Sequence, residues 1–428
     1  MSKLKWGVGV IIALSATAVG GHLYTAQSLK SFYQQDVIPQ SEKFSVQYQN
    51  FEMGLLRGQA DWHAQLRLDP CKPNEVIRFQ GQDQIHRSWD GYRIHSQIKL
   101  IQAEPSVQKL FEVPLQADTR ITWTGQTQTT LTTPAISQKL NNLQVILDPV
   151  RLTIQGKPKE QEFKLLKLQL EMPNLTVTDQ TSYLQLSGLK FATDQGLNQQ
   201  LLEAGKTEMR LERMKVIGTG LQKSRQAELR NLHFETQTEL TERVVNTQMA
   251  FGLQEMSFPG TSGIREVKFN FDLNEVHQGK LLEVLQVLKN AEQNCVPANA
   301  LLKRLEPALV GMMNEGFAFA SKDNQMKVEQ GFAKATINGR VMPGHQANFE
   351  SLWKMMPRLL EYNAELQFDK NLVAALMKGV LGQGRGSSDQ EIENMLTKMQ
   401  ESGQLKREGD VMKMAVEYKY GEKKFLTE

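Results

Sequence analysis

Residues 164–170 read Lys164-Leu165-Leu166-Lys167-Leu168-Gln169-Leu170. The last three leucines alternate with Lys167 and Gln169, so an extended strand here would have one apolar and one polar face. This alternation is typical of antiparallel sheets with one solvated face, because parallel strands that are covered on both faces are apolar throughout. The stretch therefore favours an antiparallel sheet over a Rossmann-like architecture.

The same alternation recurs on both sides of this stretch. β-Branched and aromatic residues alternate with polar ones in residues 77–84, 92–101, 120–132 and 144–154. Residues 227–238, 243–256 and 264–273 continue the pattern, and each segment is longer than the usual strand of five or six residues. Long strands in succession predict a long, curved, mainly antiparallel sheet over residues 25–273.

The periodicity changes after Leu273. Leu281, Val284, Leu285 and Leu288 recur at helical spacing, and a second amphipathic helix is expected after Pro297. Further strands and helices alternate towards the C-terminus. We therefore expect residues 274–428 to form an α+β region in which the helices pack on the sheet. The fold class predicted for the whole chain is α+β, with the helices concentrated in the C-terminal half.

The N-terminal residues 1–24 predict a membrane anchor. Residues 6–24 contain no Asp, Glu, Lys or Arg, and they follow Lys3 and Lys5, which should stay in the cytoplasm. A span of about 20 apolar residues crosses a bilayer. The anchor residues are Trp6, Val10, Ile11, Ile12, Leu14 and Tyr24. A cleaved signal peptide is the alternative, since Ala16-Thr17-Ala18 has the small-x-small form of a cleavage site. Either reading exports the body of the protein.

The charge and the cysteine content limit the kinds of partner and site that are expected. The 50 Lys and Arg residues nearly balance the 47 Asp and Glu residues, and they are spread along the chain, so a nucleic-acid partner is not expected. Cys71 and Cys295 are far apart and lack the CxxC spacing of zinc or redox sites. They could form one disulfide in an oxidising compartment.

Catalytic motifs are not found in the sequence. There is no HExxH, no GxSxG, no P-loop and no clustered set of His, Cys and Asp ligands. Asp61 and His63 are two residues apart on a predicted strand, so they would lie on the same face and could be imagined as an acid-base pair. Catalysis would also need a nucleophile or a metal, which the sequence does not supply, so two polar residues on a solvated face are the favoured interpretation. We therefore expect no enzyme, no catalytic residue, no cofactor and no metal.

Several segments resemble the YdgA and YihF-like proteins of the bacterial envelope, a family of unknown function. They are Gly20-Gly21-His22-Leu23-Tyr24 and residues 48–58, 391–396, 403–410 and 414–422. The sequence departs from the family pattern at its end, where Phe425-Leu426-Thr427-Glu428 replaces the usual Asn-Gly. The resemblance implies an N-terminal anchor and a closing helix and hairpin. It implies no catalytic residues.

Together these patterns predict a non-enzymatic protein of the bacterial inner membrane. It would cross the bilayer once and carry its body in the periplasm, with a structural or interaction role in the cell envelope. Its partners would be the lipid bilayer, through the N-terminal segment, and an envelope protein or phospholipid. The alternative is a lipid or amphiphile carrier that uses an apolar groove of the curved sheet. The sequence favours packing of that apolar face on the C-terminal helices over an open groove.

Overall fold

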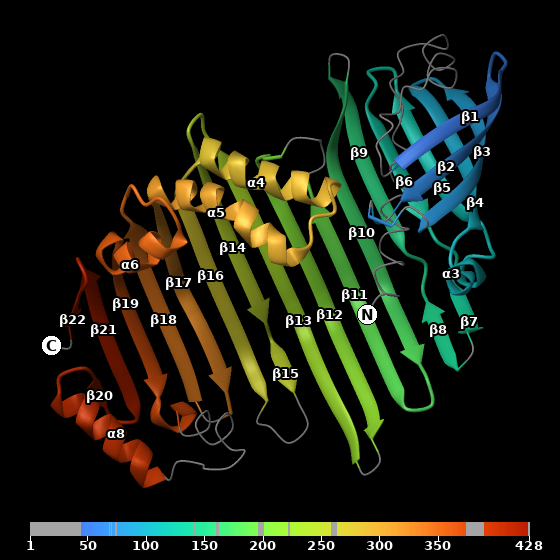
Figure 1. Cartoon of the computed structure of the whole chain (residues 1–428). Coiled ribbons are helices and arrows are strands. Elements are labelled where there is room, and N and C mark those ends of the chain that lie inside the picture. Colours follow the sequence, from blue (N-terminus) through green and yellow to red (C-terminus); the bar gives the residue numbers. More distant parts are fainter. Residues whose placement is uncertain are drawn as a thin grey trace. The chain divides into compact units, whose positions relative to one another are not determined.

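The computed structural model describes residues 44–426, apart from residues 68, 70, 73–74, 141, 160–161, 196–200, 221–222, 258–262, 330 and 374–388 (Figure 1). The chain divides into two compact units. Unit 1 contains Met1–Gln200 and Glu292–Cys295, and unit 2 contains Leu201–Ala291 and Val296–Glu428.

The described part of unit 1 contains antiparallel strands and the short helix α3 (Pro105–Leu110). The strands are β1 (Phe44–Met53), β2 (Arg57–Arg67), β3 (Val76–Ser88), β4 (Gly91–Gln102), β5 (Leu115–Thr122), β6 (Thr127–Thr132), β7 (Ile136–Leu140), β8 (Leu143–Leu147), β9 (Arg151–Lys159), β10 (Glu162–Thr178) and β11 (Ser182–Thr193). Neighbouring strands pair from β1 to β6 in chain order, and β9 then pairs with β6. Strand β10 pairs with β9 and β8 along one edge and with β11 along the other.

The core of unit 1 follows from the period-two alternation of its strands. Every second side chain of β3 turns inward, and Ile77, Phe79 and Ile85 are fully buried. Strands β4, β5, β6 and β9 contribute buried residues in the same way, including Tyr92, Leu131 and Leu152. This cluster is the largest buried core of the described chain.

Unit 2 is a meander of long antiparallel strands. They are β12 (Gly205–Gly220), β13 (Lys223–Leu240), β14 (Val244–Leu253), β15 (Glu255–Ser257), β16 (Ile264–His277), β17 (Phe317–Val328), β18 (Gly331–Val341), β19 (Leu360–Asp369), β20 (Lys406–Glu408), β21 (Val411–Lys419) and β22 (Glu422–Phe425). The main ladder runs from β12 through β13, β14, β16, β17, β18 and β19 to β21. The short strands β20 and β22 pair with β21.

Four described helices belong mainly to unit 2. They are α4 (Gln278–Gln293), α5 (Ala298–Asn314), α6 (Phe349–Leu359) and α8 (Asp389–Glu401). Figure 1 shows α4, α5 and α6 at one end of the unit 2 strands and α8 near the opposite end of β19 and β21. The helices therefore cover the ends of this sheet and not its whole length.

The antiparallel sheet is confirmed, because every described strand ladder is antiparallel. The predicted fold class is wrong in other respects. The structure is mostly sheet, with 62% strand against 19% helix, which does not fit an α+β chain with its helices gathered in the C-terminal half. Helix α3 lies among the strands of unit 1. Strands are favoured over helices because sequences that alternate apolar and polar residues, such as that of β10, can pair with neighbouring strands along their whole length.

The predicted transmembrane helix also finds no support in the structure. None of the helices within the described residues is long and apolar enough to cross a membrane. The predicted anchor itself, including Trp6, Val10, Ile11, Ile12, Leu14 and Tyr24, lies outside the described residues.

Candidate functional site

One face of the unit 2 sheet is apolar across its width. The ladder register aligns apolar side chains from distant parts of the sequence into rows that cross the strands. One row is Met209, Phe234, Phe251 and Phe269. A second is Leu253, Val267, Met326, Ala333, Phe368 and Met412. A third is Leu273, Phe319, Gly339, Tyr362 and Tyr418. We call these three rows the apolar face.

The close packing of the third row depends on Gly339. A Cβ atom at this position would lie 2.5 Å from Cζ of Phe319 and 2.8 Å from Cβ of Tyr362. The glycine thus leaves room for both aromatic side chains on the same face. The rings of Tyr362 and Tyr418 stack with centroids 5.2 Å apart.

The opposite face of the same strands is polar and charged. Gln248 pairs with Asp272, and Asn363 pairs with Glu417. On this face the carboxylate of Glu266 forms ion pairs with Nζ of Lys327 at 2.6 Å and with Nζ of Lys268 at 3.1 Å. These two lysines hold the pKa of the Glu266 carboxyl below its ordinary value, the hydrogen bond from Lys327 being the larger cause. The sheet is therefore amphipathic, as expected for one solvated and one apolar surface.

Helices pack on the two ends of the apolar face. At one end, Val310 of α5 and Leu352 of α6 form a buried cluster with Val341 of β18. At the other end, Ile392 and Leu396 of α8 pack with Phe368 and Met412. The two clusters lie at opposite ends of β18 and β19, so α8 packs on the β18 and β19 end of the second row.

Four phenylalanines lie together on this side of the sheet, three from the first row and Phe271, two positions along β16 from Phe269. Phe234, Phe251, Phe269 and Phe271 lie on adjacent strands β13, β14 and β16, and none of them belongs to a buried cluster of the described residues. Phe269 is 46% exposed, and its ring stacks on that of Phe271 with centroids 6.5 Å apart. We call these four residues the aromatic floor. Large exposed apolar groups that lie together mark binding surfaces more often than single exposed residues do.

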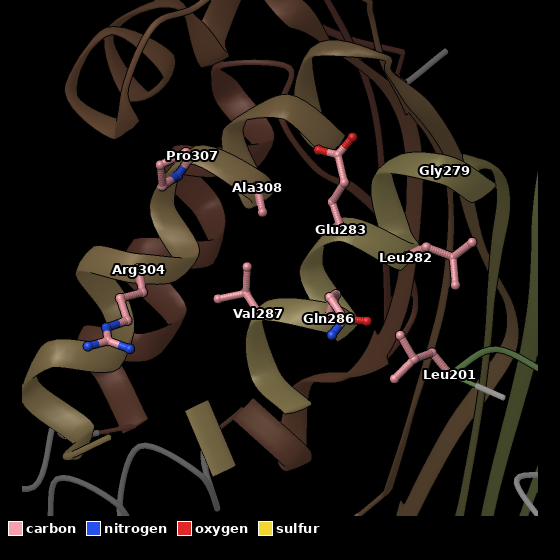
Figure 2. A pocket seen from close by; sticks show the side chains of 9 residues that line it. All are labelled: Leu201, Gly279, Leu282, Glu283, Gln286, Val287, Arg304, Pro307 and Ala308. Carbon is pink, nitrogen blue, oxygen red and sulfur yellow. The ribbon is translucent and has the colours of Figure 1, made fainter. Parts of the chain in front are cut away.

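A separate pocket lies between α4 and α5. Figure 2 shows the side chains that line it, with Val287 and Ala308 on facing helices and Arg304 at its edge. Its volume is about 690 Å³, and Leu201, Leu282 and Pro307 complete the apolar part of its wall. The pocket shares no residue with the apolar face.

One cluster of side chains has the composition of a metal site. Glu208, His233 and Glu235 place one potential ligand atom each within 4.8 Å of one another. Lys206 pairs with Glu235 at 2.8 Å, and Arg210 pairs with Glu208. These two cations balance both carboxylates, so a divalent cation would have to displace them. The arrangement fits a network of ion pairs better than a metal site.

Buried polar groups in unit 1 form a second cluster. The indole N–H of Trp62 donates to Oδ1 of Asp83 at 2.9 Å, and both residues are buried. Burial, and then the charge of Asp83, raise the pKa of Tyr48 well above its ordinary value. The Tyr48 hydroxyl therefore stays protonated at neutral pH, so it would be a poor general base.

The predicted site residues lie in different places. Cys71 and Cys295 form a disulfide within unit 1, with Cα atoms 5.5 Å apart. Asp61 and His63 face Gln82 and Gln80 across the β2–β3 ladder. Asp61 accepts a hydrogen bond from Asn50. The structure thus places the cysteines together and leaves the Asp61–His63 pair among polar neighbours.

The aromatic floor and the α4–α5 pocket were not predicted from the sequence. Phe269 and Phe271 alternate with polar residues, which indicates a strand with an apolar face. The sequence does not show that Phe234 and Phe251 lie beside them. Nor does it show that Leu201 reaches the pocket wall between helices almost eighty residues further on.

Comparison with known proteins places the chain in a family. Residues 1–425 match the family described as a bacterial protein of unknown function (DUF945). The chain belongs to DUF945. No curated protein and no solved structure matches this DUF945 protein.

Proposed function

We propose that this DUF945 protein is a non-enzymatic component of the bacterial cell envelope that binds the acyl chains of a membrane amphiphile. The observation that supports the proposal is the aromatic floor of unit 2. Its phenylalanines are partly or largely exposed, and they belong to none of the buried clusters of the described residues. Burying this surface against an acyl chain is favourable by about 25 cal/mol per Å² of apolar area.

The chemistry of the floor favours an acyl chain. Strands β13, β14 and β16 are each paired on both edges, so their backbone groups are already hydrogen-bonded. A ligand on the aromatic floor meets the apolar side chains of Phe234, Phe251, Phe269 and Phe271. A hydrocarbon chain needs no hydrogen bonds, whereas the polar backbone of a peptide would lose its contacts with water.

The cellular location is part of the same proposal. Disulfides such as Cys71–Cys295 persist in oxidising compartments, which supports a body in the periplasm. Residues 1–24 would anchor the chain in the inner membrane by a single pass. The same bilayer would supply the amphiphile that the protein binds. The resemblance to the YdgA and YihF-like proteins of the bacterial envelope supports the same location. No nucleic-acid partner is proposed.

A structural role with an envelope protein as partner is the second candidate. Trp353 of α6 is 68% exposed and Leu302 of α5 is 65% exposed. Exposed Trp and Leu side chains of this kind occur at protein interfaces. They lie on helices and not on the aromatic floor, so the two candidates use different surfaces.

Photocrosslinking separates these candidates. A benzophenone amino acid is placed at position 269 of the full-length chain, and at position 248 of the opposite face as the matched control, since Gln248 is exposed on the adjacent strand. Irradiation in bacterial cells should attach phospholipid at position 269 and little at position 248, as detected by mass spectrometry. Protein adducts without lipid at position 269 would contradict the proposal.

A further inference from the structure

The pocket between α4 and α5 has the size of a small-molecule site. Its volume of about 690 Å³ lies within the range of roughly 300–1,000 Å³ that is usual for ligand pockets. Five of its lining side chains are apolar, namely Leu201, Leu282, Val287, Pro307 and Ala308. Such walls suit a hydrocarbon chain.

The polar groups of the pocket leave one positive charge. Nζ of Lys280 lies 2.9 and 3.2 Å from the two carboxylate oxygens of Glu283, so this acid is neutralised. The side chain of Gln286 donates to Asn290 at 2.8 Å. Arg304 makes no ion pair within the described part of the chain. The pocket therefore combines apolar walls with a guanidinium group at its rim.

We propose that this pocket binds a single-chain anionic amphiphile. Its hydrocarbon chain would lie against Leu282, Val287 and Ala308, and its carboxylate or phosphate oxygens would pair with Arg304. Arginine suits this role because its planar guanidinium group donates two parallel hydrogen bonds to such anions. The site shares no residue with the aromatic floor, so it adds a second, smaller binding site to the proposed function.

Binding of laurate, dodecanol and dodecyltrimethylammonium tests the charge of the ligand. These probes share one chain length and differ in charge, and lauroyl lysophosphatidylglycerol adds a phosphate headgroup. Isothermal titration of the full-length chain in amphipol should show laurate and the lysophospholipid binding about tenfold tighter than dodecanol, because only the two anions can accept charge-assisted hydrogen bonds from Arg304. Tighter binding of laurate alone, or of the lysophospholipid alone, would show whether the site prefers a carboxylate or a phosphate headgroup. Equal affinity for laurate and dodecanol would overturn the proposal.

Substitution of Arg304 tests the residue. Arg304→Glu should weaken laurate binding by about tenfold or more, while Arg304→Lys should retain most of it. Lys303→Glu is the matched control, because it makes the same charge change on the next residue of α5, which does not line the pocket. It should alter the affinity by less than about twofold. Equal weakening by Arg304→Glu and Lys303→Glu would show a general field effect and contradict the site.

A substitution in the aromatic floor separates this site from the proposed function. Phe269→Glu should abolish lipid capture at the aromatic floor and leave laurate binding unchanged. Loss of laurate binding in Phe269→Glu would show that the two surfaces are one site and would overturn the inference of a separate pocket. Because all three substituted residues are at least partly exposed, thermal unfolding of each variant should match that of the unchanged protein.

Discussion

Gly81 provides the space that Trp62 occupies in unit 1. A Cβ atom at position 81 would lie 1.9 Å from Cε2 of the indole ring. Gly81→Ala should displace Trp62, weaken its hydrogen bond to Asp83 and lower the free energy of unfolding by about 2–4 kcal/mol. Urea denaturation measures this change. Gly218→Ala is the control, since a Cβ atom there meets nothing within 4 Å. Equal losses in both variants would contradict the account.

Glu228 makes the folding stability of unit 2 depend on pH. Its side chain is 9% exposed, accepts a hydrogen bond from Nε of Arg230 at 2.6 Å and forms an ion pair with Nε of Arg213 at 2.9 Å. The hydrogen bond from Arg230, followed by that from Arg213, lowers the pKa of Glu228 below its ordinary value of 4.5. A carboxyl with a lowered pKa contributes stability that is present above the unfolded value and is lost as the pH falls through the folded value.

The stability of the protein should therefore fall on acidification below about pH 4.5. In Glu228→Gln this part of the loss should be absent, so the urea midpoint should change less steeply between pH 5 and pH 3. Glu350→Gln is the control, because Glu350 is 77% exposed and pairs only with the exposed Lys354. An unchanged slope in Glu228→Gln would contradict the assignment.

At the scale of elements, helix α6 depends on its N-terminal cap. The side chain of Asn348 accepts from the Ser351 N–H at 2.8 Å, and the Ser351 hydroxyl accepts from the Asn348 N–H at 3.2 Å. Asn348→Ala should cost about 1 kcal/mol, because such capping boxes satisfy otherwise unpaired backbone donors. Lys354→Ala, which removes only an exposed pair, should cost less than about 0.5 kcal/mol. Thermal unfolding compares the two, and a larger loss for Lys354→Ala would disprove the capping role.

The alternation of residues 164–170 predicts a strand because that signal is local. The face that each leucine joins depends on the partner strand. A β-bulge between Leu165 and Lys167 shifts the register against β9, and Leu165, Leu168 and Leu170 pack against the core of unit 1. Bulges form where two strands meet, so the predicted grouping of Leu166 with Leu168 and Leu170 could not anticipate it. For the same reason residues 243–256, expected as one strand, divide at Gln254 into β14 and β15.

At the scale of the whole molecule, the candidate site follows from long-range pairing. The apolar face combines residues from Met209 to Tyr418, and each strand shows its own alternation in the sequence. Which strands are neighbours, and how far the helices extend over them, depends on contacts between distant segments. The sequence favoured an apolar face packed on helices, and α5, α6 and α8 pack on parts of it around Val341 and Phe368. The aromatic floor could therefore be expected as apolar, but its exposure could not be predicted.

The disulfide is the longest covalent constraint within the described residues. Cys71 and Cys295 are 224 positions apart, so their bond restricts a large loop of the unfolded chain. The chain-entropy relation gives about 5 kcal/mol for a loop of this length, which is an upper value. The double variant Cys71→Ser with Cys295→Ser should therefore unfold at a clearly lower urea concentration. The same loss should follow when the unchanged protein is reduced, and the double variant should then show no further change.

The state of these cysteines in cells also tests the proposed location of the body. In the periplasm both thiols should be oxidised, because that compartment maintains disulfides. A maleimide reagent that adds a large polymer should then leave the denatured protein unshifted on a gel, and prior reduction should allow two additions. Cys71→Ser, which leaves Cys295 without its partner, should accept one polymer without reduction and calibrates the shift. Two additions to the unreduced wild-type chain would place the body in a reducing compartment and contradict the envelope proposal.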